Sequence, residues 1–175
     1  PGMLGGNYLA AGIEHNEHGD PTVSGQVHAR MNEKRFKQLD PLKQRRDLFL
    51  IEGDPDAPLA MIAWGSVAGV CREALTKVRA SGHRAKLLVP YLLYPIAEGI
   101  YEEFLASVKG GLVVELSHQG QLYRTLRMFV DVPRGLVSMH RSGANPFQPD
   151  EVALRLQQVS LDLQRRASER VVTEG

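Results

Sequence analysis

The segment between residues 12 and 22 gathers the side chains most able to do chemistry. Two imidazoles and three carboxylates stand there beside turn-forming residues. Such groups can bind zinc, but a closed zinc site usually takes its ligands from helices or strands, and this segment predicts neither. We therefore expect no metal site and interpret the segment as a polar loop that is solvated or docked on another surface. The residues concerned are Glu14, His15, Glu17, His18 and Asp20.

A short glycine–serine segment follows a run of apolar residues and precedes a predicted helix. Residues 65–69, Gly-Ser-Val-Ala-Gly, lie where backbone N–H groups and the helix dipole could hold an anion. The segment has neither the Gly-x-Gly-x-x-Gly pattern nor the Lys-Ser/Thr of a P-loop. Gly65 and Ser66 therefore indicate either a tight turn with a capping hydroxyl or part of a small ligand crevice.

A further polar group ends the apolar run at residues 112–116. Because ligands collect at the carboxyl ends of strands in open α/β sheets, these side chains could line one crevice with Ser66. The adjacent Ser117 and His118 do not indicate a hydrolytic pair, since neighbours in an extended segment point in opposite directions. We predict that the two turns lie side by side and form an interface or a ligand crevice. The residues assigned to it are Gly65, Ser66, Glu115, His118 and Gln119.

The stretch from His28 to Arg46 is strongly basic, with seven lysines and arginines against Glu33 and Asp40. Phosphate contacts with nucleic acid would use such a face. However, Phe36 is the only aromatic residue in it that could stack on a base, and no known nucleic-acid module matches. A solvated helix or a surface for an acidic partner is the alternative that we favour, so we expect no nucleic acid partner.

Composition narrows the class of protein. The chain of 175 residues suits one domain of ordinary size, and its charges nearly cancel, so no global field favours nucleic acid or an anionic membrane. Cys71 is the only cysteine, which excludes an intrachain disulfide and an iron–sulfur cluster held by this chain alone. No apolar stretch reaches the length of a membrane span, and no signal segment opens the sequence, so we expect a cytoplasmic protein. The opening Pro1 and the glycines after it suggest a piece of a larger protein.

The hydrophobic pattern alternates between strand and helix after an N-terminal arm. Residues 24–39 predict a helix, with Val27, Met31, Phe36 and Leu39 as its inward side, which ends at the Asp-Pro pair that follows. Trp64 and Cys71 fall on faces that we expect to be buried. Alternation of this kind predicts an open α/β sheet covered by helices on both faces. Strands are predicted at 47–51, 59–64, 86–93, 112–116 and 136–139, and helices at 67–82 (opened by Ser66 and stopped by Gly82), 97–108, 121–129 and 149–170.

Four segments in order resemble the C-terminal part of the alpha subunit of 2-oxoacid:ferredoxin oxidoreductases, and most of all the 2-oxoglutarate branch. The resemblance covers nearly the whole chain. One position departs from it, since the family commonly has Glu-x-Asn where this chain has Ser117. The segments are Gly-Ile-Glu-His-Asn-Glu-His-Gly-Asp-Pro-Thr at 12–22, Ala-Trp-Gly-Ser at 63–66, Leu-Val-Pro-Tyr-Leu-Leu-Tyr-Pro at 88–95 and Val-Glu-Leu-Ser-His-Gln-Gly-Gln-Leu at 114–122.

The resemblance implies a particular fold and domain organisation. The fold would be that of the transketolase C-terminal domain, a three-layer α/β/α arrangement with a mostly parallel five-stranded sheet whose first strand is an antiparallel edge. Residues 1–46 would be an arm and basic helix that lead from an upstream cofactor-binding domain outside this chain, with Glu14 and His15 near that domain. Residues 47–175 would form the α/β domain.

The resemblance also implies an activity for the complete enzyme. Such enzymes oxidatively decarboxylate a 2-oxo acid, here 2-oxoglutarate, to an acyl-coenzyme A and pass electrons to ferredoxin. Thiamin diphosphate, magnesium and an iron–sulfur cluster would be held by the upstream domains and the beta subunit, and this chain would hold no cofactor and no catalytic residue. The chain alone would be inactive. In the complete enzyme it would brace the assembly, with Glu115 and Gln119 as interface anchors. Replacement of Glu115 by alanine would then leave the stability of the lone domain nearly unchanged. The alternative is a stand-alone α/β module that binds a small anion at the carboxyl edge of its sheet.

Overall fold

The computed structural model describes residues 2–7 and 10–173. It divides the chain into two compact units, with the boundary after Leu42. That boundary lies four residues before the end of the arm and basic helix predicted from the sequence, and each unit is described by itself below.

The first unit consists of an arm and one helix, α1 (Gly25–Leu39). Ser24 begins the helix, because its hydroxyl accepts a hydrogen bond from the backbone N–H of Val27 at 3.5 Å. No residue of α1 is buried, and Phe36 is 58% exposed, so the predicted inward side does not form a core. The predicted end at Leu39 is correct, and the chain continues as two short 3-10 helices, η1 (Asp40–Gln44) and η2 (Arg46–Leu48).

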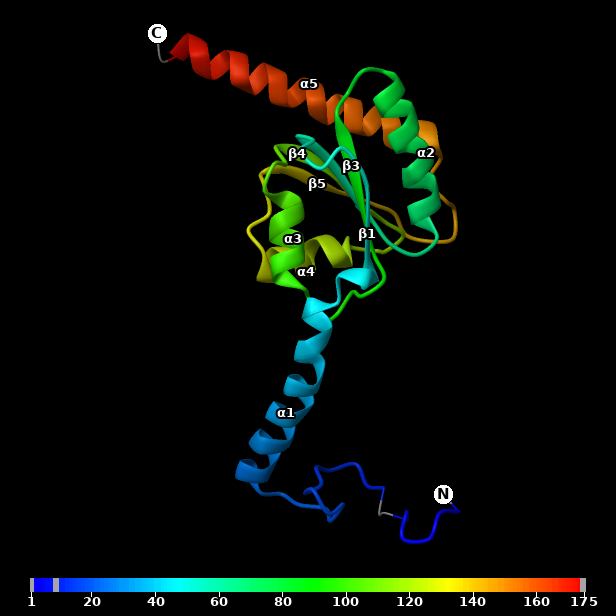
Figure 1. Cartoon of the computed structure of the whole chain (residues 1–175), viewed down its shortest axis with the longest axis vertical. Helices are drawn as coiled ribbons and strands as arrows, with labels where there is room; N and C mark the ends of the chain where they lie inside the picture. The colour runs from blue at the N-terminus through cyan, green and yellow to red at the C-terminus, as the bar shows by residue number, and fades with distance from the viewer. Residues whose placement is uncertain (1, 8–9, 174–175) are drawn as a thin grey trace. The chain divides into compact units, whose positions relative to one another are not determined.

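The second unit is a three-layer α/β/α domain around a five-stranded sheet of order β1-β3-β2-β4-β5 (Figure 1). β1 pairs antiparallel with β3 at one edge, and the other neighbours are parallel, which confirms the predicted sheet. The strands are β1 (Phe49–Gly53), β2 (Leu59–Ala63), β3 (Ala85–Pro90), β4 (Gly110–Glu115) and β5 (Gly135–His140).

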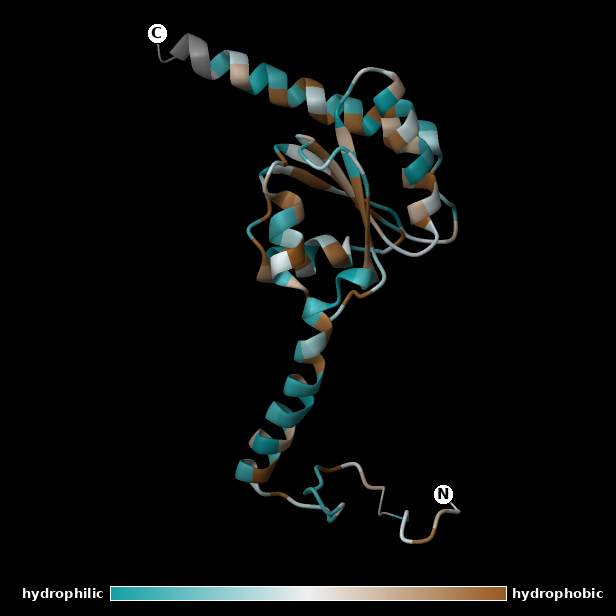
Figure 2. Cartoon of the chain, viewed as in Figure 1, coloured by the Kyte–Doolittle hydropathy of each residue, from teal (hydrophilic) through white to brown (hydrophobic). Residues whose placement is uncertain are grey.

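Helices cover both faces of this sheet and build a core on each side. α2 and α5 pack on one face around Met61, Leu87 and Leu112, and α3 and α4 pack on the other around Ile62, Leu88 and Val113. Successive residues of a strand point to opposite faces, so β2, β3 and β4 are buried along their whole length and are mainly apolar, as Figure 2 shows; the charged exceptions are Lys86 and Glu115. The helices are α2 (Val67–Ala80), α3 (Glu98–Leu105), α4 (Gln121–Phe129) and α5 (Pro149–Thr173).

Two glycines allow α5 to approach the start of β4 and β5 closely. A Cβ atom on Gly110 would lie 2.8 Å from Cδ1 of Leu163, and one on Gly135 would lie 3.0 Å from Cδ2 of the same side chain. The Leu163 side chain could adjust to such contacts, but a Cβ atom on Gly135 would also lie 2.2 Å from the backbone carbonyl oxygen of Lys109, so this position requires glycine. The helix itself begins as predicted, with Pro149 in its first turn and the carboxylate of Glu151 accepting a hydrogen bond from the backbone N–H of Gln148.

The amino edge of the sheet contains a buried lysine. Lys86 is 2% exposed, and its ammonium donates hydrogen bonds to the carbonyl of Pro55 at 2.7 Å and to the hydroxyl of Ser107 at 2.9 Å. The ammonium also lies 4.7 Å from the centre of the Phe104 ring. Burial lowers the pKa of this lysine, and its contacts link the turn before β2 to the residues after α3.

Candidate functional site at the carboxyl edge of the sheet

The turns after β2 and β4 lie side by side, as predicted. Ala63 pairs with Val114 in parallel register, so Trp64 and Glu115 leave adjacent strands at the same edge. β3 lies on the other side of β2, where Ile62 pairs with Leu88, so the segment after β3 reaches this edge too. The edge therefore combines three turns, which is the usual position of a ligand site in an open α/β sheet.

Glu115 is fully buried at this edge and caps a helix. Its two carboxylate oxygens accept hydrogen bonds from the backbone N–H groups of Leu122 at 3.0 Å and Tyr123 at 3.1 Å. These groups belong to the first turn of α4, whose N–H groups have no acceptor within the helix. A carboxylate there also meets the positive end of the helix dipole. The expectation that Glu115 lines a crevice or anchors an interface is therefore wrong, because the side chain lies inside the domain and both its oxygens are engaged.

Ser117 completes the same cap. Its hydroxyl accepts hydrogen bonds from the backbone N–H groups of Gly120 at 3.0 Å and Gln121 at 3.2 Å. Gly120 has a φ of +65°, a left-handed conformation that lets the turn close between strand and helix. With Glu115 and Ser117 in place, consecutive N–H groups at the start of α4 all have acceptors within the chain. This helix end therefore offers no free donors to an anion.

The other predicted residues of the edge are exposed. Nδ1 of His118 lies 2.7 Å from the hydroxyl of Ser142, and the side-chain oxygen of Gln119 accepts a hydrogen bond from the Arg124 guanidinium at 3.3 Å. Both residues thus lie at the surface of the turn after β4. They are available to a neighbouring surface, in contrast to Glu115.

Gly65 and Ser66 are also exposed, at the start of α2. Gly65 has a φ of +60°, which the tight turn after β2 requires. Ser66 occupies the N-cap position but has helical dihedral angles and makes no capping hydrogen bond, so the predicted capping hydroxyl is wrong. Gly82 at the other end of α2 has a φ of +85° and stops the helix as predicted.

A hollow of about 270 Å³ opens between the turns after β2 and β3 and the start of α4. Its walls are mainly apolar and aromatic, and none of its residues carries a formal charge. The indole Nε1 of Trp64 is buried and has no hydrogen-bond partner among the described residues, while Tyr94 is 52% exposed. Trp64 as a whole is half-buried and lines this hollow, so it is only partly a core residue, contrary to expectation. This carboxyl-edge hollow suits an apolar group better than an anion. It is lined by Trp64, Leu93, Tyr94, Gln121, Leu122 and Thr125.

The contribution of the segment after β3 was missed from the sequence. Residues 86–93 were predicted as one strand, whereas β3 ends at Pro90 and Leu93 lies in the turn that lines the hollow. A signal was present, because Pro90 and Pro95 bracket this stretch, and proline is unfavourable inside a strand.

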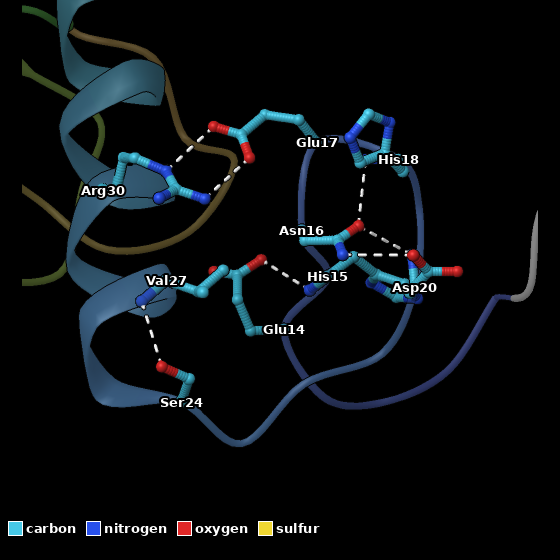
Figure 3. A network of polar contacts seen from close by, with 9 residues as sticks. All are labelled: Glu14, His15, Asn16, Glu17, His18, Asp20, Ser24, Val27 and Arg30. Atoms are coloured by element: carbon cyan, nitrogen blue, oxygen red, sulfur yellow. Dashed lines mark hydrogen bonds and ion pairs between the residues drawn. The ribbon is translucent and has the colours of Figure 1, made fainter.

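Two carboxylates of the arm, Glu14 and Glu17, are paired with arginines of α1. The Arg30 guanidinium donates hydrogen bonds to both carboxylate oxygens of Glu17 at 2.9 and 2.8 Å, as Figure 3 shows. Arg35 pairs in the same way with Glu14, with Nη1 donating to Oε2 at 2.9 Å. This hydrogen-bonded pairing with Arg35 lowers the pKa of Glu14 to about 2. The arm therefore neutralises part of the basic face that the sequence suggested.

The loop of the arm is held by one amide side chain. Oδ1 of Asn16 accepts hydrogen bonds from the backbone N–H groups of His18 at 2.9 Å and Asp20 at 3.0 Å (Figure 3). His15 also pairs with Pro21 in an isolated β-bridge. Across residues 2–7 and 10–173, no three histidine, cysteine, aspartate or glutamate side chains are placed to hold a metal ion.

Cys71 lies in the core against the sheet, as predicted. Burial raises the pKa of its thiol to about 12, so the thiolate that nucleophilic chemistry needs does not form at neutral pH. The residues described above therefore provide a surface and a hollow but no nucleophile with an adjacent base.

Comparison with known proteins decides the family. The model of the pyruvate:ferredoxin oxidoreductase core domain II matches residues 57–152, which is more than half of the chain. The chain belongs to this family. It is 31% identical over 127 residues to subunit alpha of 2-oxoacid:ferredoxin oxidoreductase 2 from Aeropyrum pernix, which covers 71% of the chain and 20% of that protein. The core domain II residues include all three turns of the carboxyl edge.

Solved structures agree with this assignment. The 2-oxoglutarate:ferredoxin oxidoreductase of Magnetococcus marinus matches 91% of the chain with 31% identity and a TM-score of 0.78, over 28% of its own length. A split-gene transketolase matches 63% of the chain and 40% of its own with a TM-score of 0.51 and 15% identity, which supports the transketolase-like fold alone. The chain spans about a fifth to a quarter of the curated relatives. Among the described residues, no helix is long and apolar enough to cross a membrane.

Proposed function

We propose that the chain is core domain II of the alpha subunit of a 2-oxoacid:ferredoxin oxidoreductase that acts on 2-oxoglutarate. The observation that carries this proposal is the match to the Magnetococcus marinus enzyme, at 31% identity over 91% of the chain. That structure holds 2-oxoglutarate, coenzyme A and succinyl-CoA. The complete enzyme would thus oxidise 2-oxoglutarate to succinyl-CoA in the cytoplasm and transfer electrons to ferredoxin.

The described residues do not fit an iron–sulfur cluster or a metal ion held by three protein ligands. One buried cysteine cannot ligate an iron–sulfur cluster, and the described residues offer no group of three ligands for magnesium. Thiamin diphosphate, magnesium and the cluster would therefore be held by the upstream domains and the beta subunit. The residues of this chain would bind none of them, and no step of the reaction is assigned to them.

The role of this domain would be to brace the assembly. The carboxyl-edge hollow has the apolar, aromatic wall and polar rim that are typical of a protein interface. Gly65, Ser66, His118 and Gln119 are the exposed residues of that edge. Residues 1–46 would form a linking arm, with Glu14 and His15 near the upstream domain.

The alternative function, binding of a small anion at this edge, has less support. The start of α4 already has the Glu115 carboxylate and the Ser117 hydroxyl as acceptors. An anion placed there would compete with a buried negative charge. No observation at this edge favours it over an interface.

The first experiment tests the activity. The complete alpha and beta subunits are expected to reduce a viologen dye with 2-oxoglutarate, coenzyme A, thiamin diphosphate and magnesium, and to do so faster than with pyruvate. The 175-residue chain alone is expected to reduce none. A preference for pyruvate would overturn the substrate, and dye reduction by the chain alone would overturn the bracing role.

The second experiment tests the interface with a matched pair of tyrosines. Tyr94→Ala removes a wall of the hollow, whereas Tyr91→Ala removes an exposed tyrosine that does not line it. In the complete enzyme, Tyr94→Ala is expected to weaken subunit association by about 1–3 kcal/mol and Tyr91→Ala by much less, measured by analytical ultracentrifugation. Equal effects of the two substitutions would show that the hollow is not the contact.

A further inference from the structure

A second, smaller hollow lies at the amino end of β5 and is bordered by three arginines. Its volume is about 140 Å³. Arg134 precedes β5, and Arg155 and Arg166 belong to α5; none of the three guanidinium groups has a hydrogen bond or an ion pair among the described residues. Seven other arginines of the described residues are paired with carboxylates, whereas Arg79, Arg124, Arg127 and Arg165 are not; the paired ones are Arg30, Arg35, Arg45, Arg46, Arg72, Arg84 and Arg141.

The floor of this arginine hollow is well defined. Val137, Val159 and Leu163 supply apolar surface, and the close contact of Leu163 with Gly135 sets the position of α5 over β5. Residues 155, 159, 162, 163 and 166 recur at helical spacing, so one side of α5 forms a wall of the hollow. The three guanidinium groups therefore extend from elements that are packed against each other, and the aliphatic parts of the arginine side chains border the apolar floor.

The single carboxylate in the hollow does not neutralise the arginines. Asp162 accepts a hydrogen bond from the side-chain amide of Gln158 at 2.9 Å and forms no ion pair with any of the three. Three positive charges and one negative charge leave an excess of two positive charges in the lining. An anion with a charge near −2 would balance it.

The chemistry of the lining selects a phosphate group. The planar fork of arginine matches two oxygens of a phosphate or carboxylate, and it gives up hydration more easily than lysine. The volume is below the roughly 300–1,000 Å³ of pockets that enclose whole drug-sized ligands, so the hollow suits one such group with the rest of any larger ligand outside. We propose that Arg134, Arg155 and Arg166 form a binding site for a phosphate group, either free phosphate or the terminal phosphate of a nucleotide-type ligand.

This inference is independent of the proposed function, since it depends only on the arginine hollow and lies at the opposite edge of the sheet from the carboxyl-edge hollow. The test uses the 175-residue chain at low ionic strength, with inorganic phosphate and ADP as probes in separate titrations followed by calorimetry and by the side-chain Nε–Hε signals of arginine. Saturable binding with shifts confined to the three arginines is expected.

A matched control is next to the site. The double substitution Arg155→Gln and Arg166→Gln is expected to weaken binding at least tenfold, since each lost charged hydrogen bond accounts for about that factor. Arg165→Gln removes one positive charge at the position next to Arg166 on α5, outside the lining, and is expected to leave binding nearly unchanged, whereas Arg166→Gln alone, which removes the same charge, is expected to weaken it. All three side chains are exposed, so the variants should fold, which circular dichroism would check.

Each outcome decides the matter. Loss of binding in the double variant but not in Arg165→Gln supports the site; tighter binding of ADP then identifies a nucleotide-type ligand, and equal binding identifies phosphate itself. A loss in Arg165→Gln equal to that in Arg166→Gln alone shows diffuse attraction to a basic helix and overturns the site. If the unchanged chain shows saturable binding of neither phosphate nor ADP up to about 10 mM, the site is also overturned. A dissociation constant above that concentration corresponds to a binding free energy weaker than about 3 kcal/mol.

Discussion

Replacement of Glu115 by alanine removes the carboxylate that caps α4 and should destabilise the domain strongly. The N–H groups of Leu122 and Tyr123 would lose their acceptor inside the protein. A buried donor without an acceptor costs about 1–3 kcal/mol, and loss of a charge at the helix dipole costs a further ~0.3–1 kcal/mol. Leu122 is buried and Tyr123 only partly so, and water can satisfy the second group in part. We therefore expect a loss of about 2–5 kcal/mol, out of the roughly 5–15 kcal/mol of an ordinary domain.

The assay is urea unfolding of the 175-residue chain, followed by circular dichroism and by the fluorescence of Trp64, the only tryptophan. Glu102→Ala is the matched control, because Glu102 is an exposed carboxylate on α3 with no hydrogen bond or ion pair among the described residues. The Glu102→Ala substitution should change the unfolding free energy by less than about 0.5 kcal/mol. Glu115→Gln keeps one acceptor oxygen but presents an amide donor to the second N–H group, so its loss should be intermediate. If Glu115→Ala were no worse than Glu102→Ala, the capping argument would be refuted.

Two further predictions follow from single side chains. Tyr101→Phe should raise the unfolding free energy by about 1 kcal/mol. The Tyr101 hydroxyl is buried without a hydrogen-bond partner among the described residues, so its removal avoids the cost of burying an unpaired polar group. A lower urea midpoint would contradict this prediction. The pKa of Glu14 should be near 2 rather than its ordinary 4.5, so the stabilisation that it gives the arm is complete above about pH 4.5 and is lost as the pH falls through about 2. A ¹³C titration of the Glu14 carboxyl would measure this pKa, and Arg35→Gln should return it towards the ordinary value; a midpoint already near 4.5 would disprove the pairing.

Much of the fold was predictable because its signals are local. The fully apolar stretch at β2 predicts a strand buried on both faces, and the helical recurrence from Val67 to Val78 predicts α2. The limits of α4 agree with the structure at both ends. The residues around Pro90 were less predictable, because an apolar run continues past the point where the strand stops pairing. Pairing depends on the neighbouring strand, which the pattern of one segment does not contain.

Contacts between distant residues were not predictable in the same way. The pairing of Glu14 with Arg35 requires the arm to fold back along α1, and hydrophobic periodicity carries no information about such a return. The arginine hollow is an intermediate case. The spacing of Arg155 and Arg166 places them on one side of a helix, but the approach of Arg134 depends on how α5 crosses the start of β5.

Glu115 shows why a polar residue at the end of a strand is ambiguous. The position has two possible partners: a molecule beyond the sheet edge, or the free N–H groups of the helix that follows. The length of the turn decides between them, because α4 begins only six residues after Glu115 and Gly120 allows the chain to reverse closely enough for the carboxylate to reach its first turn. A short turn with a glycine before the helix therefore favours a cap over a ligand. Because the cap consumes the charge at this edge, the surface that remains is an apolar hollow with an uncharged rim, which is suited to packing against another domain rather than to chemistry.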